Sequence, residues 1–117
     1  MDTATARKRL EEICHDLDRS ITVLQGENHR EEDASAAYQR DPADAGANLS
    51  EADRSQAVLE AAQRQRTEVV NALSRLDTGA YGTCVDCGDS VPDGRLEAKP
   101  EAARCVRCQS KHDRQRH

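Results

Sequence analysis

The chain has 117 residues and a formal net charge of −5, and 33% of its side chains are charged. Leu, Ile, Val and Phe together number 17, about 15%, which is below the roughly 20% that a packed domain usually contains. This composition excludes a large globular core. Ala, Glu, Lys, Leu and Arg make up 52 residues, close to the half that is typical of long helices and coiled coils. We therefore expect an all-α dominated fold.

The first part of the chain carries a stripe of apolar residues at spacings of three and four, namely Leu10, Ile13, Leu17, Ile21 and Leu24. This spacing places the side chains on one face of an α-helix, as in a coiled-coil seam. Beyond Gln25 the stripe fades, although good helix formers continue. The pattern predicts a first helix over about residues 3–38.

The helical pattern is interrupted around residue 42. Pro42 disfavours helical geometry at Asp41, and Gly46 adds a flexible position a few residues later. We therefore expect a connecting loop over about residues 39–49.

A second helical pattern follows this loop. Asn48 or Ser50 can cap the helix at its start, and Gly79 is the residue type that often follows a last helical turn. The pattern predicts a helix over about residues 50–78, with an apolar stripe of Ala52, Leu59, Ala62, Val69, Leu73 and Leu76.

Two long helices joined by a short loop are expected to pack as an antiparallel hairpin. Such a hairpin can serve as an ordinary dimerisation element. Between Glu27 and Asp53, however, eight acidic residues stand against Arg30 and Arg40. Because like charges repel, a seam that weakens toward an acidic end is a poor dimer interface. We therefore expect a monomer whose acidic tip acts as a probe.

Four of the five cysteines form two C-x-x-C pairs with 17 residues between them, Cys84 with Cys87 and Cys105 with Cys108. This arrangement is typical of a four-cysteine zinc site. Gly82 and Gly88 flank the first pair, where a tight turn favours positive φ. Four thiolates complete a tetrahedron and leave no position for water or substrate, so we expect one structural Zn²⁺ ion and no catalytic metal.

The alternatives for the cysteine pairs are a redox dithiol and an iron site with the same ligands. A single C-x-x-C would favour the redox interpretation, whereas two C-x-x-C pairs favour a metal site. The remaining cysteine, Cys14, lies near the apolar stripe of the first helix, and we expect it to be a passive, partly buried thiol.

Charge is distributed unevenly along the chain. Residues 1–94 carry 19 acidic and 10 basic side chains, whereas residues 95–117 carry 3 acidic and 7 basic ones. The acidic part would repel a nucleic acid. The basic tail leaves three alternatives open, which are docking on an acidic protein surface, contact with nucleic acid, and simple solvation; its residues include Arg104, Arg107, Lys111, Arg114 and Arg116.

Apolar runs in this chain are far shorter than the ~20 residues needed to cross a bilayer, so we expect no membrane association. Residues 1–25 are charged throughout and contain no apolar stretch of a secretory signal. We expect a cytoplasmic protein, where reducing conditions favour metal binding over disulfide formation.

Three stretches of the cysteine-bearing segment are distinctive: Gly-Ala-Tyr-Gly-Thr-Cys at residues 79–84, Arg-Leu-Glu-Ala-Lys-Pro at residues 95–100, and Cys-Val-Arg-Cys at residues 105–108. Together with the upstream hairpin, they resemble the DksA/TraR C4-type zinc finger family of bacterial transcription regulators. The resemblance implies a coiled-coil hairpin over residues 1–78 and a four-cysteine zinc finger with a short basic C-terminal helix over residues 79–117. It also implies a non-enzymatic regulator that binds RNA polymerase directly, without sequence-specific DNA contact.

The same resemblance implies that the coiled coil enters the secondary channel of the polymerase, through which nucleotides reach the active site. Residues 41–46, Asp-Pro-Ala-Asp-Ala-Gly, match the family's tip pattern Asp-x-x-Asp-x-Ala, with Gly46 in place of the alanine. Asp41 and Asp44 then act close to the catalytic centre and modulate initiation. From the residues alone, the alternative is that both aspartates are turn residues that form local hydrogen bonds.

Some members of this family also respond to the alarmone guanosine tetraphosphate through basic residues. By ungapped register, Glu68 and Gln109 fall where such members place lysines. Because a polyphosphate would meet an anion at Glu68, we expect a weak or absent alarmone response. The leading alternative for the whole protein is a zinc-stabilised nucleic-acid-binding module that acts through the basic C-terminal tail, which strong salt dependence of binding would reveal.

Overall fold

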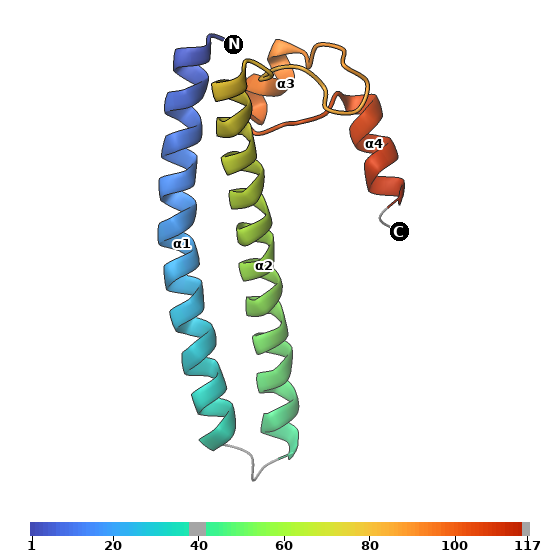
Figure 1. Cartoon of the computed structure of the whole chain (residues 1–117). Helices are drawn as coiled ribbons and strands as arrows, with labels where there is room; N and C mark the ends of the chain where they lie inside the picture. The colour runs from blue at the N-terminus through green and yellow to red at the C-terminus, as the bar shows by residue number, and fades with distance from the viewer. Residues whose placement is uncertain (38–41, 116–117) are drawn as a thin grey trace. The chain divides into compact units, whose positions relative to one another are not determined.

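The computed structural model contains four helices among its described residues, with an isolated antiparallel bridge between Thr83 and Ser90 and no strand. The expected helical fold with a hairpin, a cysteine-bearing segment and a short C-terminal helix is confirmed. In chain order the helices are α1 (Thr3–Ala37), α2 (Pro42–Thr78), α3 (Asp93–Ala98) and α4 (Val106–Gln115) (Figure 1).

The structure describes the backbone of residues 1–37 and 42–115, and the side chains of residues 1–26 and 51–115. Within these ranges no helix is long and apolar enough to cross a membrane.

The chain forms two compact units. The base unit comprises Met1–Cys14 and Thr67–His117, and the arm unit comprises His15–Arg66. Both long helices contribute to both units. The expected division into a hairpin over residues 1–78 and a zinc finger over residues 79–117 stays a prediction.

In the base unit, the start of α1 packs against the end of α2. Asp2 caps α1, because its carboxylate accepts a hydrogen bond of 3.2 Å from the backbone N–H of Thr5. An ion pair of 2.7 Å joins Arg7 to Asp77. The side chains buried in this part of the helices are small or aliphatic, namely Ala6, Leu10, Val69 and Ala72.

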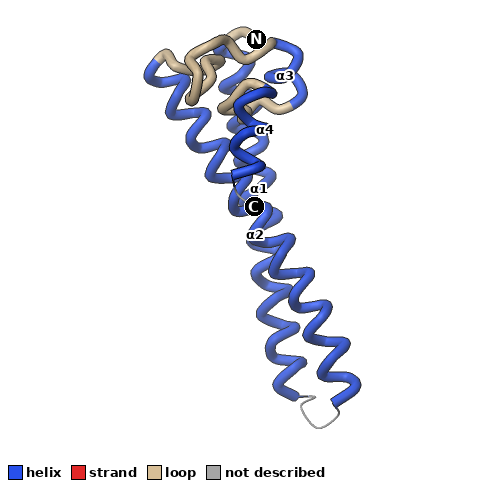
Figure 2. Tube along the Cα trace, turned by 90° about the vertical axis from the view of Figure 1, so that its right-hand side faces the viewer, coloured by secondary structure: helices blue, strands red, loops and turns tan. Residues whose placement is uncertain are grey.

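In the arm unit, the same two helices lie side by side (Figures 1 and 2). Asp18 of α1 pairs with Arg66 of α2. Leu59 is 6% exposed, whereas Leu17, Ile21 and Leu24 are only half-buried. The apolar seam predicted from the sequence is therefore present, and it is less completely buried here than in the base unit.

The start of α2 differs from the expectation. The helix begins at Pro42, so the predicted loop over residues 39–49 is too long and neither Asn48 nor Ser50 is its cap. The physical reason is that proline is well suited to the first helical position, where its fixed φ is already helical and its missing N–H has no intrahelical partner. Alanines at positions 43, 45 and 47 then favour continuation of the helix.

The end of α2 agrees with the prediction. Gly79 follows the last helical residue with a φ of 78°, a conformation that is strained for residues with a Cβ atom. The N–H of Ala80 donates to the carbonyl of Arg75 at 2.8 Å and closes the helix end. The short helix α3 was not predicted; it follows Pro92, and its Leu96 is buried.

Two adjacent valines of α2 allow a test of the base-unit seam. Val69 is fully buried, and Val70 is 40% exposed. Truncation of Val69 to Ala removes apolar contacts and should lower the free energy of unfolding by about 2 kcal/mol, measured by chemical denaturation of the zinc-loaded protein.

The control is Val70→Ala, which makes the same chemical change in the same helix and should alter the free energy of unfolding by less than about 0.5 kcal/mol. Equal losses for the two variants would contradict the packing described here.

Candidate metal centre

Four cysteine sulfurs converge on one point of the base unit. The Sγ atoms of the four residues lie within 4.8 Å of one another, and those of Cys87 and Cys105 are 3.9 Å apart. A tetrahedral zinc site with bonds of about 2.3 Å has sulfurs about 3.8 Å apart. The donor set and its spacing therefore fit one zinc ion, with Cys84, Cys87, Cys105 and Cys108 as ligands.

Each cysteine pair is shaped by a tight backbone turn. In the first pair, the N–H of Gly88 donates to the carbonyl of Cys84 at 3.0 Å, and the N–H of Cys84 donates to the carbonyl of Asp89 at 2.7 Å. Gly88 has a φ of 79°, which confirms the conformation expected from the sequence. The second pair leads directly into α4, where the N–H of Gln109 donates to the carbonyl of Cys105 at 2.9 Å.

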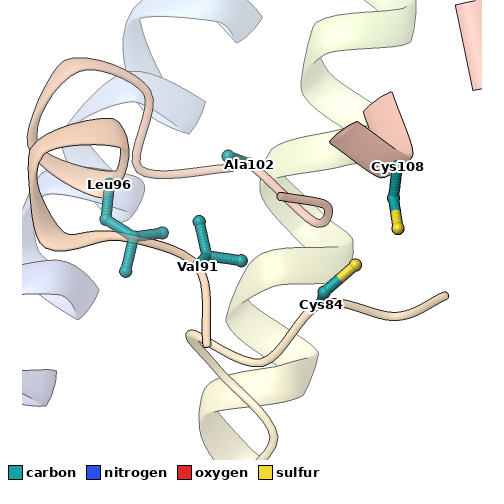
Figure 3. Packing of buried hydrophobic residues seen from close by; sticks show 5 residues of the cluster. All are labelled: Cys84, Val91, Leu96, Ala102 and Cys108. Carbon is teal, nitrogen blue, oxygen red and sulfur yellow. The ribbon is translucent and has the colours of Figure 1, made fainter. Parts of the chain in front are cut away.

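A small core lies under the metal site. Its buried members come from the finger alone (Figure 3), and Met1 and Tyr81 pack against them. The Tyr81 hydroxyl donates to the carbonyl of Pro100 at 2.9 Å. Figure 3 shows the sulfurs of two members turned toward one another; the members are Cys84, Val91, Leu96, Ala102 and Cys108. A cluster of this size gives little stabilisation, so metal binding of roughly 10–16 kcal/mol is a major part of the stability of the finger.

Two of the four ligand thiols have pKa values shifted in opposite directions. Backbone N–H groups, that of Cys87 first, hydrogen-bond to the sulfur of Cys84 and lower its pKa to about 6. Hydrogen bonding with the Cys105 side chain, followed by burial, raises the pKa of Cys108 to about 12. One sulfur is therefore already a thiolate near neutral pH, whereas another keeps its proton until a metal displaces it.

A cation lies beside this cluster. The Cys87 side chain, with Cys105 and Cys108 nearby, raises the pKa of the Arg107 guanidinium. A zinc ion with four thiolates has a net charge of −2, and a neighbouring arginine offsets part of it. The sequence pattern identified Arg107 only as a member of the basic tail, because the position of its side chain is decided by the folded turn.

The other candidate residues lie apart from the cluster. Cys14 is a half-buried free thiol on α1, which agrees with the expected partial burial, whereas its passive role stays a prediction. Asp41 falls outside the described residues. Asp44 lies in the first turn of α2, and its side chain is outside the described residues. The role of both aspartates stays a prediction.

Glu68 and Gln109, which are far apart in sequence, line one cavity of about 220 Å³ in the base unit. The Glu68 carboxylate is 3.6 Å from the Lys99 ammonium, and Lys99 lines the same cavity. Arg75 also lines it, and burial lowers the pKa of this arginine. The cavity therefore combines cationic groups with an anion that already pairs with one of them.

Comparison with known proteins agrees with this site. Residues 79–114 match the profile of the prokaryotic dksA/traR C4-type zinc finger. The RNA polymerase-binding transcription factor DksA of Caulobacter vibrioides is 32% identical over 107 residues, which cover 89% of this chain and 68% of that protein. The protein of the same name from Haemophilus influenzae is 26% identical over 100 residues, covering 86% of this chain and 63% of the relative.

A solved structure has a similar fold. The transcription factor DksA2 from Pseudomonas aeruginosa aligns with a TM-score of 0.76 and 26% sequence identity, covering 100% of this chain and 90% of that chain. The family profile and the cluster of four sulfurs together assign one structural zinc ion to the finger.

The acidities predict how zinc binding depends on pH. The metal-free finger holds a proton on Cys108 throughout the neutral range, whereas the zinc-bound site holds none. Because binding releases at least this proton, raising the pH favours binding. The apparent association constant should rise by at least about tenfold per pH unit between about pH 7 and pH 9, measured by competition with a chromophoric chelator of known pH dependence.

The control for this measurement is Cys14→Ser, which leaves the ligand set intact and should give the same slope. An association constant that stays flat over this pH range would contradict the assigned protonation.

Proposed function

Because this chain belongs to the prokaryotic dksA/traR C4-type zinc finger family, we propose that it is a transcription regulator that binds RNA polymerase. The observation that carries the proposal is the four-cysteine site joined to a two-helix hairpin, in a chain 32% identical to an RNA polymerase-binding transcription factor over 89% of its length. Four thiolates occupy the coordination positions of the zinc, so the regulator acts by binding and not by catalysis.

The proposed mode of binding is insertion of the hairpin into the secondary channel of the polymerase. Helices of 35 and 37 residues, each about 50 Å long at 1.5 Å per residue, form the element that would insert. A hairpin that is formed before binding loses little conformational entropy when it enters a channel. We place Asp41 and Asp44 at the working tip, where they alter the stability of initiation complexes.

Carboxylates at such a tip act electrostatically. Fixed negative charge in a narrow and poorly hydrated pore acts over several ångströms on a metal ion or on a cationic loop of the polymerase. A neutral tip of the same shape would occupy the channel without this field. The two aspartates therefore contribute regulation, whereas the rest of the hairpin contributes affinity.

In this proposed function the protein acts as a monomer in the cytoplasm, because one hairpin fills one channel and free thiols suit a reducing compartment. Contact with the promoter is made through the polymerase, without sequence-specific DNA binding by this chain.

A second candidate function rests on α4. Its exposed basic residues Arg107, Lys111 and Arg114 recur at spacings of four and three, as on one helix face. A nucleic-acid-binding module would use them against phosphates. Binding of DNA or RNA by the isolated protein that falls steeply with salt would favour this alternative.

Site-specific crosslinking from position 44 tests the tip proposal. A photoreactive residue at this position is mixed with purified polymerase, and the products are mapped by mass spectrometry. We expect products on the large catalytic subunits near the active centre. A matched probe at Ser55 on α2, outside the tip, reports contacts elsewhere. Absence of active-centre products from position 44, with products from position 55, would refute insertion tip first.

Neutralisation of the tip separates regulation from binding. The pair Asp41→Asn and Asp44→Asn keeps the shape of both side chains but removes their charge. Polymerase binding should stay within about twofold, whereas the effect on open-complex lifetime should be lost, because the field of the carboxylates is gone.

The matched control is the pair Glu51→Gln and Asp53→Asn, which removes the same charge from α2 outside the tip and should retain regulation. Equal regulation by the tip pair and the wild type would show the aspartates to be passive.

The cavity that holds Glu68 predicts a weak alarmone response. The Glu68 carboxylate lies 3.6 Å from Lys99, so an incoming polyphosphate meets an anion and competes for a lysine that is already paired. Calorimetry with guanosine tetraphosphate should show no additional tight site when this protein is added to polymerase. The variant Glu68→Gln should strengthen any residual binding. Tight binding that depends on the wild-type protein would overturn this prediction.

A further inference from the structure

The two cysteine pairs are tied together by contacts that do not involve the cysteine side chains. The N–H of Val85 in the first pair donates to the carbonyl of Ala103 at 3.0 Å, just before the second pair. Beside it, Arg104 Nε lies 2.7 Å from an Asp86 carboxylate oxygen. Asp86 stands between Cys84 and Cys87, and Arg104 directly precedes Cys105. This ion pair therefore spans the two halves of the metal site.

The arginine of this pair is held in place from both ends. Its backbone carbonyl accepts a hydrogen bond of 2.9 Å from Arg95 Nε, which comes from α3. Its side chain is 24% exposed, and that of Asp86 is 46% exposed. Partial burial strengthens a charge pair relative to one in open solvent, and a fixed backbone reduces the entropy lost when the pair forms.

The charge around Arg104 makes its partner important. Arg75 of α2 lines the same cavity as Arg104, and the charge of Arg104 adds to burial in lowering the pKa of Arg75. Glu68 and Glu101 also line this cavity, whereas Asp86 is the carboxylate that pairs directly with Arg104. Loss of Asp86 would leave the Arg104 guanidinium without this partner beside another cation.

We propose that Asp86 and Arg104 form a clamp that holds the two cysteine pairs in register, independently of the metal, and that both are positioning residues of the zinc site. Because the clamp keeps the four sulfurs close together, less conformational entropy is lost when zinc binds. It also slows zinc release, because release requires the two cysteine pairs to separate. Neither side chain is a ligand, and the proposal does not depend on what the hairpin tip does.

The test measures zinc release from the full chain after addition of a chromophoric chelator, together with affinity by competition. The variants are Asp86→Asn and Arg104→Gln, singly and combined. Each single variant should release zinc about tenfold faster and bind it about tenfold more weakly, as for other residues that orient metal ligands. The double variant should lose no more than either single one, because both remove the same interaction.

The matched control is Glu97→Gln. It removes one negative charge from the exposed surface of α3 in the same finger, and within the described part of the chain the Glu97 side chain has no ion-pair partner. This variant should stay within about twofold of the wild type, whereas 1 M salt should bring the wild type closer to Asp86→Asn. An Asp86→Asn variant that behaves like Glu97→Gln would refute the clamp.

A charge swap keeps the proposal testable if the single variants bind zinc too weakly to measure. Asp86→Arg combined with Arg104→Asp should recover zinc affinity relative to Asp86→Arg alone by at least about fivefold, since the pair is restored with opposite polarity. Co²⁺, which binds such sites more weakly than zinc and absorbs visible light when held by four thiolates, gives a second affinity. A swap that binds no better than Asp86→Arg would overturn the proposal.

Discussion

Gathering four sulfurs around one ion is the constraint on which the rest of the base unit depends. The finger buries only a handful of small or aliphatic side chains, so its hydrophobic core is too small to be a major source of stability. The sulfurs also differ in acidity, with the pKa of Cys84 lowered to about 6 and that of Cys108 raised to about 12. Binding of a divalent cation displaces the remaining thiol protons and holds all four thiolates at one centre.

The packing of the base unit connects the metal site to the long helices. The start of α1, the end of α2 and the cysteine-bearing segment belong to the same compact unit. Met1 packs against the core of the finger, and Leu10 and Val69 are fully buried between the helices. Zinc binding therefore stabilises the unit that holds the start of α1 and the end of α2.

Three ion pairs join different segments of the base unit. Glu68 of α2 faces Lys99, which follows α3, and gives their shared cavity a mixed charge. Asp86 and Arg104 join the two cysteine pairs. Arg7 and Asp77 join the ends of the long helices. The two more exposed pairs, Arg7 with Asp77 and Glu68 with Lys99, contribute little individually, whereas the Arg104 side chain of the third pair is only 24% exposed. Each pair joins segments that are distant in sequence and so favours one arrangement over its alternatives.

The amino-acid sequence by itself determined the two long helices, the glycine that ends α2 and the identity of the four ligands, because each depends on local spacing and on residue chemistry. The predicted loop over residues 39–49 was too long. Pro42 interrupts the helical pattern of the first helix, but it also suits the first position of α2. Only the tertiary structure decided that Asp86 meets Arg104, that Glu68 meets Lys99 and that Arg107 lies beside the sulfurs. The two ion pairs join residues 18 or more positions apart, and the position of the Arg107 side chain depends on the conformation of a turn. Neither can be predicted from the periodicity of the sequence.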